Sequence, residues 1–510
     1  MTELDPFNLP EQLNLAEVFL YRKAREQPNA PAIFFEDEII TYGELADATN
    51  RATAVYKAHD LELEQRVLLM LPDIPQFASA WLGAVKAGGV VSAVNPDIKA
   101  DEARYYLNYT RAKILVADQT AMPVVESVWK DCPHLKHVLV AGGTYDAALK
   151  VATPDHSFAP THRDDPAVWL YTSGSTGFPK AAVHKHHDFV FNALLYALKV
   201  IGYSPNDKTF SVPRLAFGYA LGSNLLFPLI AGGSCVLFRE KGSPEMLFEV
   251  IQRHRPTMLI TVPTSLNQVV SAPQVDKIDF SSIRLAVSAG EALPAELYQK
   301  WKKTTGVEVL DGIGSAEMFH IFITNRLVDV KLGSLGKIVE GYRAKVCDDE
   351  GRELPRGEVG TLWVNGDSMA LEYWQQHEKS KQTFRGDWCV SADKFQQDEE
   401  GYFYFCGRGD DMLKVGGKWL SPVEVENALL QHPAVREAAV VGFKDKDGLD
   451  KPRAFVALHA GKTGGDALAE ELKAHVRDKL APFKAPRDVV FIDALPRSDR
   501  GKVLKTELRK

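Results

Sequence analysis

Short apolar runs that alternate with amphipathic stretches are the feature that most constrains the fold of this chain of 510 residues. The runs are rich in β-branched residues and too short for helices, so they predict strands. They lie at residues 66–70, 112–116, 137–140 and 258–262. The amphipathic stretches include residues 78–86 and 294–304, which predict helices. Strands that alternate with helices are typical of α/β proteins with largely parallel sheets.

Two changes in the residue pattern along the sequence indicate further divisions of the chain. Residues 333–364 read as hairpin strands with turns such as Asp-Asp-Glu-Gly, which predicts a small β-barrel-like subdomain. Residues after about Arg408 form a separate α+β unit, so we expect domains at 1–407 and 408–510. In the second unit, Ser421 is a predicted N-cap and Pro422 the first residue of a helix that ends near Gln431.

Bulk composition excludes several classes of protein. The net charge of −7 argues against a nucleic-acid binder, whose surface would be basic. No apolar run approaches the ~20 residues that span a bilayer, and the N-terminal segment does not resemble a signal peptide. The five cysteines include no Cys-x-x-Cys pair, which predicts reduced thiols. We therefore expect a cytoplasmic enzyme with no membrane or nucleic-acid partner; the sequence leaves open whether it forms a homodimer.

The segment YTSGSTGFPK at residues 171–180 carries four Ser/Thr hydroxyls, two glycines and one lysine. Glycines let backbone N–H groups approach an anion, and hydroxyls add donors, so the segment predicts a phosphate-binding loop. A Walker A loop needs Gly-x-x-x-x-Gly-Lys, whereas Gly174 and Gly177 are three apart and Phe178-Pro179 precede Lys180. A P-loop kinase or GTPase is therefore disfavoured.

This loop resembles the signature loop of the adenylate-forming enzymes, the family of acyl-CoA synthetases, luciferases and peptide-synthetase adenylation domains. The likeness runs nearly end to end, because further segments follow the order of the family. They are ITYGEL at 40–45, KAGG at 86–89, SAGEAL at 288–293, GIGSAE at 312–317, GRGDD at 407–411 and PRSDRGK at 496–502.

The resemblance implies a reaction of a carboxylic acid with ATP, which gives an acyl-adenylate and pyrophosphate, followed by transfer of the acyl group to coenzyme A. Glu317 and Thr172 would hold Mg²⁺ with hard oxygen ligands. The β- and γ-phosphates would be bound by Ser173, Gly174, Ser175, Thr176, Gly177 and Lys180. The AMP portion would lie against Gly290, Glu291, Ala292, Asp311, Gly312, Ile313, Ser315 and Ala316.

Two of these positions depart from the family pattern. Ala316 replaces a threonine whose hydroxyl would donate to the α-phosphate, a bond worth about 1.5–3 kcal/mol. Either Ser315 or a water could take its place. Ile313 replaces an aromatic that stacks on adenine, which leaves Asp311 as a candidate acceptor for the adenine amino group.

The remaining roles fall mostly in the C-terminal unit. Asp393 and Arg408 would contact the ribose, and Lys502 would reach between the carboxylate and the α-phosphate. The resemblance implies that this unit is mobile and turns about a hinge at Asp410 between the two half-reactions. Lys414, Gly416 and Gly417 would then line the coenzyme A channel.

The predicted acid pocket follows from a narrower resemblance. Residues 213–221 and 314–325 resemble benzoate-CoA ligases and their hydroxybenzoate and aminobenzoate relatives more than long-chain fatty-acid enzymes. The pocket would be lined by Phe217, Gly218, Tyr219, His320 and Ile321. Apolar walls with a few placed polar groups suit a small aromatic acid.

Other readings remain open at this point. Within enzymes, the alternatives are a short- or medium-chain fatty acyl-CoA ligase and a free-standing adenylation enzyme that loads a carrier protein. Outside enzymes, the alternative is a nucleotide- or adenylate-binding regulator, which Lys502 disfavours but Ala316 leaves open.

Overall fold

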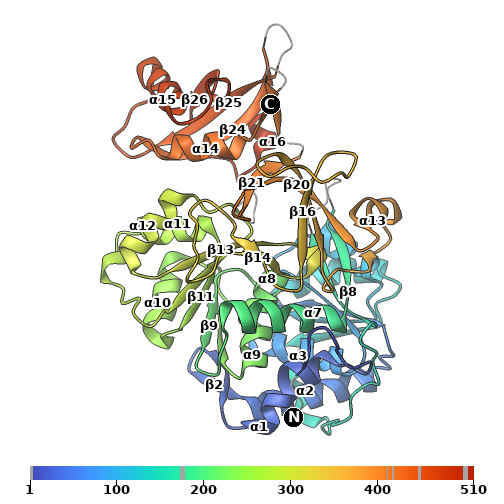
Figure 1. Cartoon of the computed structure of the whole chain (residues 1–510). Coiled ribbons are helices and arrows are strands. Elements are labelled where there is room, and N and C mark those ends of the chain that lie inside the picture. The colour runs from blue at the N-terminus through green and yellow to red at the C-terminus, as the bar shows by residue number, and fades with distance from the viewer. Residues whose placement is uncertain are drawn as a thin grey trace.

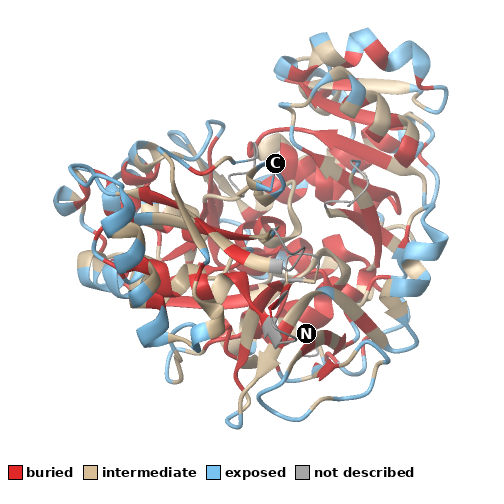
Figure 2. Cartoon of the chain, turned by 90° about the horizontal axis from the view of Figure 1, so that it is seen from above, coloured by how far each residue is buried: buried red, intermediate tan, exposed pale blue. Residues whose placement is uncertain are grey.

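Three sheets form the larger part of the chain in this computed structural model, which describes residues 4–172, 178–409, 412–415, 418–445, 450–497 and 503–509. Figure 1 shows the C-terminal unit above the antiparallel sheet of residues 343–408, at the end of the molecule away from the N-terminus. Figure 2 shows buried strands surrounded by exposed helix faces and loops. The sequence prediction of an α/β fold is confirmed.

A seven-stranded sheet carries the predicted phosphate loop. Its neighbouring strands, in order, are β18 (Glu372–Tyr373), β8 (Lys180–Lys185), β7 (Pro166–Thr172), β4 (Val90–Val94), β3 (Arg66–Met70), β5 (Ile114–Asp118) and β6 (His137–Ala141). β4, β3, β5 and β6 pair in parallel, and β7 joins β8 as an antiparallel pair. The helices include α2 (Tyr42–Ala58), α3 (Pro75–Lys86) and α4 (Ala100–Thr110).

A nine-stranded sheet carries the predicted adenine and acid sites. Its order is β15 (Lys337–Ile338), β14 (Ile321–Thr324), β13 (Val309–Gly314), β12 (Leu285–Ser288), β11 (Met258–Thr261), β9 (Lys208–Ser211), β10 (Ser234–Leu237), β1 (Pro31–Phe35) and β2 (Glu38–Thr41). Its helices include α10 (Pro244–His254), α11 (Pro263–Ser271) and α12 (Ala295–Thr305). The chain leaves β13 at its C-terminal end and returns antiparallel as β14, so the turn between them lies at the edge where parallel strands present ligands.

An antiparallel sheet follows, formed by β16 (Arg343–Cys347), β17 (Val359–Asn365), β20 (Trp388–Gln397), β19 (Phe384–Arg385) and β21 (Phe403–Arg408). The predicted hairpin is β16 with β17, and the sheet extends well beyond residue 364 because β20 and β21 complete it.

The C-terminal unit has its own apolar core, drawn from residues 413–491. It contains β22 (Leu413–Val415), β23 (Lys418–Leu420), β24 (Val435–Lys444), β25 (Asp450–Leu458), β26 (Asp488–Phe491), α14 (Pro422–Leu430) and α15 (Asp466–Lys479). The predicted cap is confirmed, because the Ser421 side chain accepts a hydrogen bond from the Glu424 N–H and Pro422 opens α14.

Candidate active site

The predicted phosphate loop is the connection of the β7–β8 hairpin. Thr172, the last residue of β7, lies directly opposite Lys180, the first residue of β8. The strand pairing therefore places the hydroxyl-bearing and the cationic ends of the loop side by side. The predicted phosphate contacts Ser173, Gly174, Ser175, Thr176 and Gly177 lie outside the described residues.

An aromatic stack fixes the segment that leads out of the loop. The ring of Phe178 stacks on Tyr105 of α4, with centroids 4.5 Å apart and planes 17° apart. The Tyr105 hydroxyl also donates to the backbone oxygen of Pro179 at 2.6 Å. These two contacts hold the residues directly before Lys180 against the seven-stranded sheet.

Lys180 and Glu317, which are far apart in sequence, meet at Tyr373. The Tyr373 hydroxyl donates to Oε1 of Glu317, and Nζ of Lys180 lies 3.5 Å from the centroid of the Tyr373 ring. Burial and the neighbouring Glu317 carboxylate raise the pKa of Tyr373, so it stays protonated and can donate. The site thus combines one carboxylate, one ammonium group and the hydroxyl of Thr172 at the mouth of the loop.

His184 ties the Glu317 turn to the seven-stranded sheet. Its Nε2 lies 2.6 Å from the backbone oxygen of Ala316, and its Nδ1 lies 2.9 Å from Oδ2 of Asp188. Burial alone would raise the pKa of Asp188, but hydrogen bonds from His184 and His187 outweigh it and hold that pKa at about 2. The His184 ring is thus held between the Ala316 carbonyl and the Asp188 carboxylate.

A strained turn separates Glu317 from His320. Phe319 has φ 66° and ψ −59°, and the His320 N–H donates to the Met318 oxygen at 2.9 Å, which is the geometry of a γ-turn with positive φ. Such a conformation costs about 1–3 kcal/mol in a non-glycine residue. The Phe319 ring packs at 4.0 Å from Phe189, which helps to hold the turn. The reversal lets the chain enter β14 immediately after the Glu317 turn.

The predicted adenine site has one open surface and one unpaired acceptor. Gly290 has φ +87°, and a Cβ built on it would meet nothing within 4 Å. Asp311 is buried, its Oδ2 accepts from the Leu293 N–H, and its Oδ1 has no partner among the described residues. Burial raises the pKa of Asp311 to about 8. The nearby Glu291 carboxylate accepts a hydrogen bond from the Thr264 hydroxyl, which fixes the position of the Glu291 side chain.

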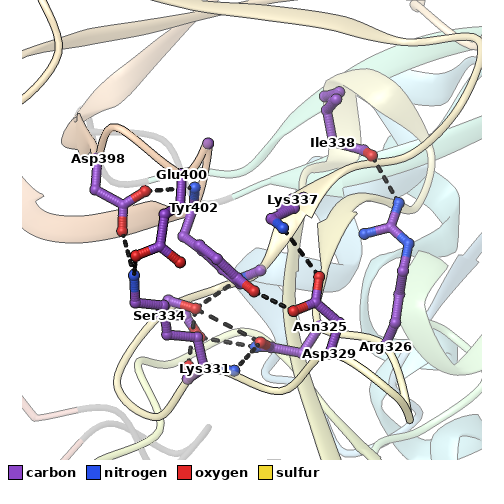
Figure 3. Close-up of polar contacts among 12 residues, drawn as sticks. Asn325, Arg326, Asp329, Lys331, Ser334, Lys337, Ile338, Asp398, Glu400 and Tyr402 are labelled. Atoms are coloured by element: carbon purple, nitrogen blue, oxygen red, sulfur yellow. Dashed lines mark hydrogen bonds and ion pairs between the residues drawn. The ribbon is translucent and has the colours of Figure 1, made fainter.

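The backbone around Asp311 is fixed by the polar cluster drawn in Figure 3. The Asn325 backbone N–H and side-chain amide both donate to the Asp311 backbone oxygen, at 3.0 and 3.2 Å. Asn325 in turn donates to the Ser334 oxygen and accepts from the Lys331 N–H. The Lys331 ammonium group contacts Asp398, which links this loop to the turn between β20 and β21.

Gly312, Ile313, Ser315 and Ala316 surround the end of β13. A Cβ on Gly312 would lie 2.7 Å from the Ile323 oxygen, so only glycine fits against β14. Ile313 and Ala316 are partly buried against the main core. The Ser315 side chain makes no capping hydrogen bond to the short helix η7 (Ala316–Met318) that follows it.

The two predicted ribose residues are neighbours. Asp393 on β20 lies directly opposite Arg408 on β21 in the strand register. The structure does not describe the side chains of Arg408 and Lys414, and Asp410, Gly416, Gly417 and Lys502 lie outside its described residues.

The predicted acid-pocket residues come together around His320. Phe217 precedes α8 (Gly218–Leu221), and Tyr219 lies within that helix, with its ring 5.5 Å from the His320 ring. The Tyr219 hydroxyl donates to the Val287 oxygen at 2.9 Å. Ile321 is buried on β14.

Gly218 is closely packed at the start of α8. A Cβ built on it would lie 2.9 Å from Cδ1 of Leu170 and 3.2 Å from the Phe319 oxygen. An added methyl group would therefore press first on Leu170 and on the strained γ-turn.

Sequence reasoning missed four residues that organise this site. They are Tyr105, His184, Asp188 and Tyr373. An imidazole on β8, His184, and a carboxylate four residues later, Asp188, so close to the loop were a usable signal. No sequence signal identified Tyr373, because its contact with Glu317 depends on the pairing of β18 with β8.

The metal-ligand set is sparse. No group of three or more His, Cys, Asp or Glu side chains suited to a metal occurs in the part of the chain that the structure describes. Glu317 and Thr172 still fit Mg²⁺, since this ion is usually held by one or two carboxylates together with substrate phosphates and water. No helix among the described residues is long and apolar enough to cross a membrane.

Comparison with protein families finds two matches along the chain. Residues 20–374 match the model of the AMP-binding enzymes, and residues 424–502 match that of the AMP-binding enzyme C-terminal domain. The chain belongs to the AMP-binding enzyme family. The resemblance inferred from the signature loop is therefore confirmed.

Among AMP-binding enzymes, the chain is similar to ligases of aromatic acids. It is 41% identical to a benzoate–CoA ligase of Thauera aromatica over 508 residues, which are 98% of this chain and 96% of that relative. It is 37% identical to a 4-hydroxybenzoate–CoA/benzoate–CoA ligase of Rhodopseudomonas palustris, over 97% of this chain and 94% of that one. The crystal structure of the anthranilate CoA ligase AuaEII with anthranoyl-AMP superposes with a TM-score of 0.94 at 37% identity, and covers 99% of this chain and 98% of that one.

Proposed function

We propose that this AMP-binding enzyme is an ATP-dependent acid–CoA ligase that activates benzoate or a substituted benzoate. The observation that carries the proposal is the meeting of Thr172, Lys180 and Glu317 at the mouth of the β7–β8 loop. The similarity to aromatic acid–CoA ligases over the full chain supports this substrate class.

In the first half-reaction, a carboxylate oxygen of the acid attacks the α-phosphorus of ATP, and the bond to the β-phosphate oxygen breaks. Pyrophosphate leaves with the electron pair. Lys180 and the loop residues Ser173 to Gly177 would bind the leaving phosphates, and Lys502 would lie between the carboxylate and the α-phosphate. Donors that are aimed at developing charge in advance usually supply the largest share of the rate.

Glu317 and Thr172 would hold Mg²⁺, which neutralises phosphate charge when it is bound. Asp311 would accept from the adenine amino group, since its Oδ1 is buried without a partner in the described part of the chain. Ser315, whose side chain does not cap η7, would replace the missing threonine hydroxyl at Ala316. Asp393 and Arg408 would hold the ribose from opposite strands.

In the second half-reaction, the sulfur of coenzyme A attacks the acyl carbonyl, the thiol loses its proton, and AMP leaves. The C-terminal unit would turn about Asp410 between the two steps and would bring Lys414, Gly416 and Gly417 to the pantetheine arm. Its separate core allows it to move as a unit.

Product analysis tests this function against its alternatives. The chain is incubated with ATP, Mg²⁺, coenzyme A and either benzoates or C6 to C10 fatty acids, and acyl-CoA and AMP are measured by mass spectrometry. We expect aroyl-CoA and AMP in equal amounts. A higher kcat/KM for the fatty acids than for every benzoate would favour the fatty acyl-CoA ligase, and adenylate without thioester would favour a carrier-protein loading enzyme.

A further inference from the structure

Two tyrosines of α4 hold the backbone on both sides of Lys180. The Tyr105 hydroxyl donates to the Pro179 oxygen at 2.6 Å, one residue before Lys180. The Tyr109 hydroxyl accepts from the Ala181 N–H at 3.3 Å, one residue after it. The first residue of β8 therefore lies between two backbone groups that are bound by side chains of one helix.

These tyrosines form one aromatic unit. Tyr105 and Tyr109 are four residues apart on α4, which places them on the same face of the helix. Their rings stack, with centroids 5.0 Å apart and planes 15° apart. The ring of Phe178 stacks on Tyr105 as well. The helix thus presents stacked rings to the residues that lead from the loop into β8.

Tyr109 also fixes the segment that carries Tyr373. Its hydroxyl donates to the Trp374 oxygen at 2.6 Å, and its backbone oxygen accepts from Nε1 of Trp374 at 3.0 Å. The Trp374 N–H donates to the Ala181 oxygen at 2.9 Å. Tyr373, whose ring centroid lies 3.5 Å from Nζ of Lys180, is therefore adjacent to a residue that Tyr109 holds.

A lysine side chain depends on such contacts for its position. Its ammonium group is a compact charge at the end of a flexible stem, so the backbone and the packed surfaces decide where the charge lies. At Lys180, the two tyrosines fix the backbone, and Tyr109 also helps to fix the ring beside the ammonium group. Burial raises the pKa of Tyr105 and Tyr109, so each hydroxyl keeps the proton that it donates.

We propose that Tyr105 and Tyr109 are positioning residues that set the affinity for the β- and γ-phosphates of ATP by placing Lys180. This inference rests on the proposed function, which gives Lys180 the leaving phosphates. Both tyrosines act through Lys180 and not by touching the nucleotide. AMP lacks the β- and γ-phosphates, so its affinity should not depend on either hydroxyl.

Nucleotide binding without the acid tests the proposal, because no adenylate can then form. The Kd of ATP and the Kd of AMP, both with Mg²⁺, are measured by calorimetry for the parent chain, Tyr105→Phe and Tyr109→Phe. Each substitution removes one hydroxyl and keeps the ring. We expect the Kd of ATP to rise by about threefold to tenfold, the usual effect of one hydrogen bond, and the Kd of AMP to stay the same.

The same substitutions in a Lys180→Ala background show whether the effect passes through Lys180. Lys180→Ala should itself weaken the binding of ATP and spare that of AMP. Adding Tyr105→Phe should then cause no further loss, since changes that act through one contact are not additive. A further loss as large as that in the parent chain would overturn the proposal.

Tyr56→Phe is the matched control. It also removes a buried tyrosine hydroxyl that donates to a backbone oxygen, that of Ala80. Both dissociation constants should stay as in the parent chain. A rise in the Kd of ATP equal to that of the α4 variants would contradict the positioning role.

A second site keeps the test decisive if a tyrosine variant does not fold, which thermal melting would reveal. Phe178 is 47% exposed, so Phe178→Ala removes the ring that stacks on Tyr105 without opening the core. It should raise the Kd of ATP and leave that of AMP unchanged. In that case an unchanged Kd of ATP would overturn the proposal.

Failure of this inference is distinct from failure of the proposed function. If Lys180→Ala weakens ATP binding and the tyrosine variants do not, the inference is wrong and the proposed function stands. If Lys180→Ala binds ATP as tightly as the parent chain, the phosphate role of Lys180 in the proposed function fails as well.

Discussion

Nε2 of His184 donates to the backbone oxygen of Ala316 at 2.6 Å, in the residue directly before Glu317. Asp188 holds the opposite nitrogen at 2.9 Å, and both side chains are fully buried. This chain lacks a threonine hydroxyl at Ala316, yet the carbonyl of the same residue is held by the His184 ring. The bond between His184 and the Asp188 carboxylate is charge-assisted, and such bonds are roughly twice as strong as neutral ones. The pair therefore positions the Glu317 turn against the phosphate loop.

Replacing His184 should impair adenylation more than thioester formation. In His184→Phe the Ala316 carbonyl loses its donor and the Glu317 turn can shift, and a misplacement of about 1 Å can cost on the order of 10²-fold in rate. We expect kcat for pyrophosphate release to fall by at least tenfold, with a smaller change in the KM of the acid. His187→Gln is the control, because His187 contacts Asp188 but not Ala316. Equal losses in the two variants would contradict the positioning role.

Asp311 should make the stability of the protein depend on pH. Burial raises its pKa from 3.8 to about 8, so the folded chain keeps a proton that the unfolded chain releases. The folded state consequently loses stability as the pH rises from about 4 to 8. In Asp311→Asn, which cannot ionise, Tm should fall less between pH 5 and pH 8 than in the parent chain. Parallel Tm profiles for the two proteins, measured by differential scanning fluorimetry, would rule out the raised pKa.

Lys502 lies outside the described residues, and its role remains a prediction. If its charge is needed only at the α-phosphate, Lys502→Ala should abolish adenylate formation and largely spare thioester formation from supplied aroyl-AMP. The two half-reactions are measured separately, with Lys505→Ala as a control, because Lys505 pairs with Glu426 within the C-terminal unit. Comparable loss in both half-reactions would remove the role assigned to Lys502.

Gly218→Ala should narrow the range of acids. The added methyl group would lie 2.9 Å from Cδ1 of Leu170 and 3.2 Å from the Phe319 oxygen, so it would press on the turn that leads into His320. We expect substituted benzoates to lose roughly tenfold to two-hundredfold in kcat/KM relative to benzoate. An unchanged ranking of the acids would show that Gly218 does not shape the pocket.

Much of the fold could be read from the sequence because local patterns set it. The apolar runs at 66–70 and 258–262 became β3 and β11, and the Ser421-Pro422 pair became the start of α14. The hydrophobic period of a strand or helix and the capping of a helix both depend on residues that are close together in the chain. Both can therefore be predicted from the sequence.

The site could be read only in part, since its chemistry depends on contacts between distant segments. The motifs identified Thr172, Lys180 and Glu317, but the link through Tyr373 requires the pairing of β18 with β8. The positive φ of Phe319 opposes its side-chain preference and is imposed by tertiary packing.

The central claim is that this chain forms an acyl-adenylate from an aromatic acid before coenzyme A takes part. The most direct measurement is the exchange of labelled pyrophosphate into ATP with benzoate or an aminobenzoate and no coenzyme A. The account predicts exchange that requires the acid and Mg²⁺ and that is lost in Glu317→Ala. Exchange that needs coenzyme A, or formation of ADP and phosphate in place of AMP and pyrophosphate, would contradict it.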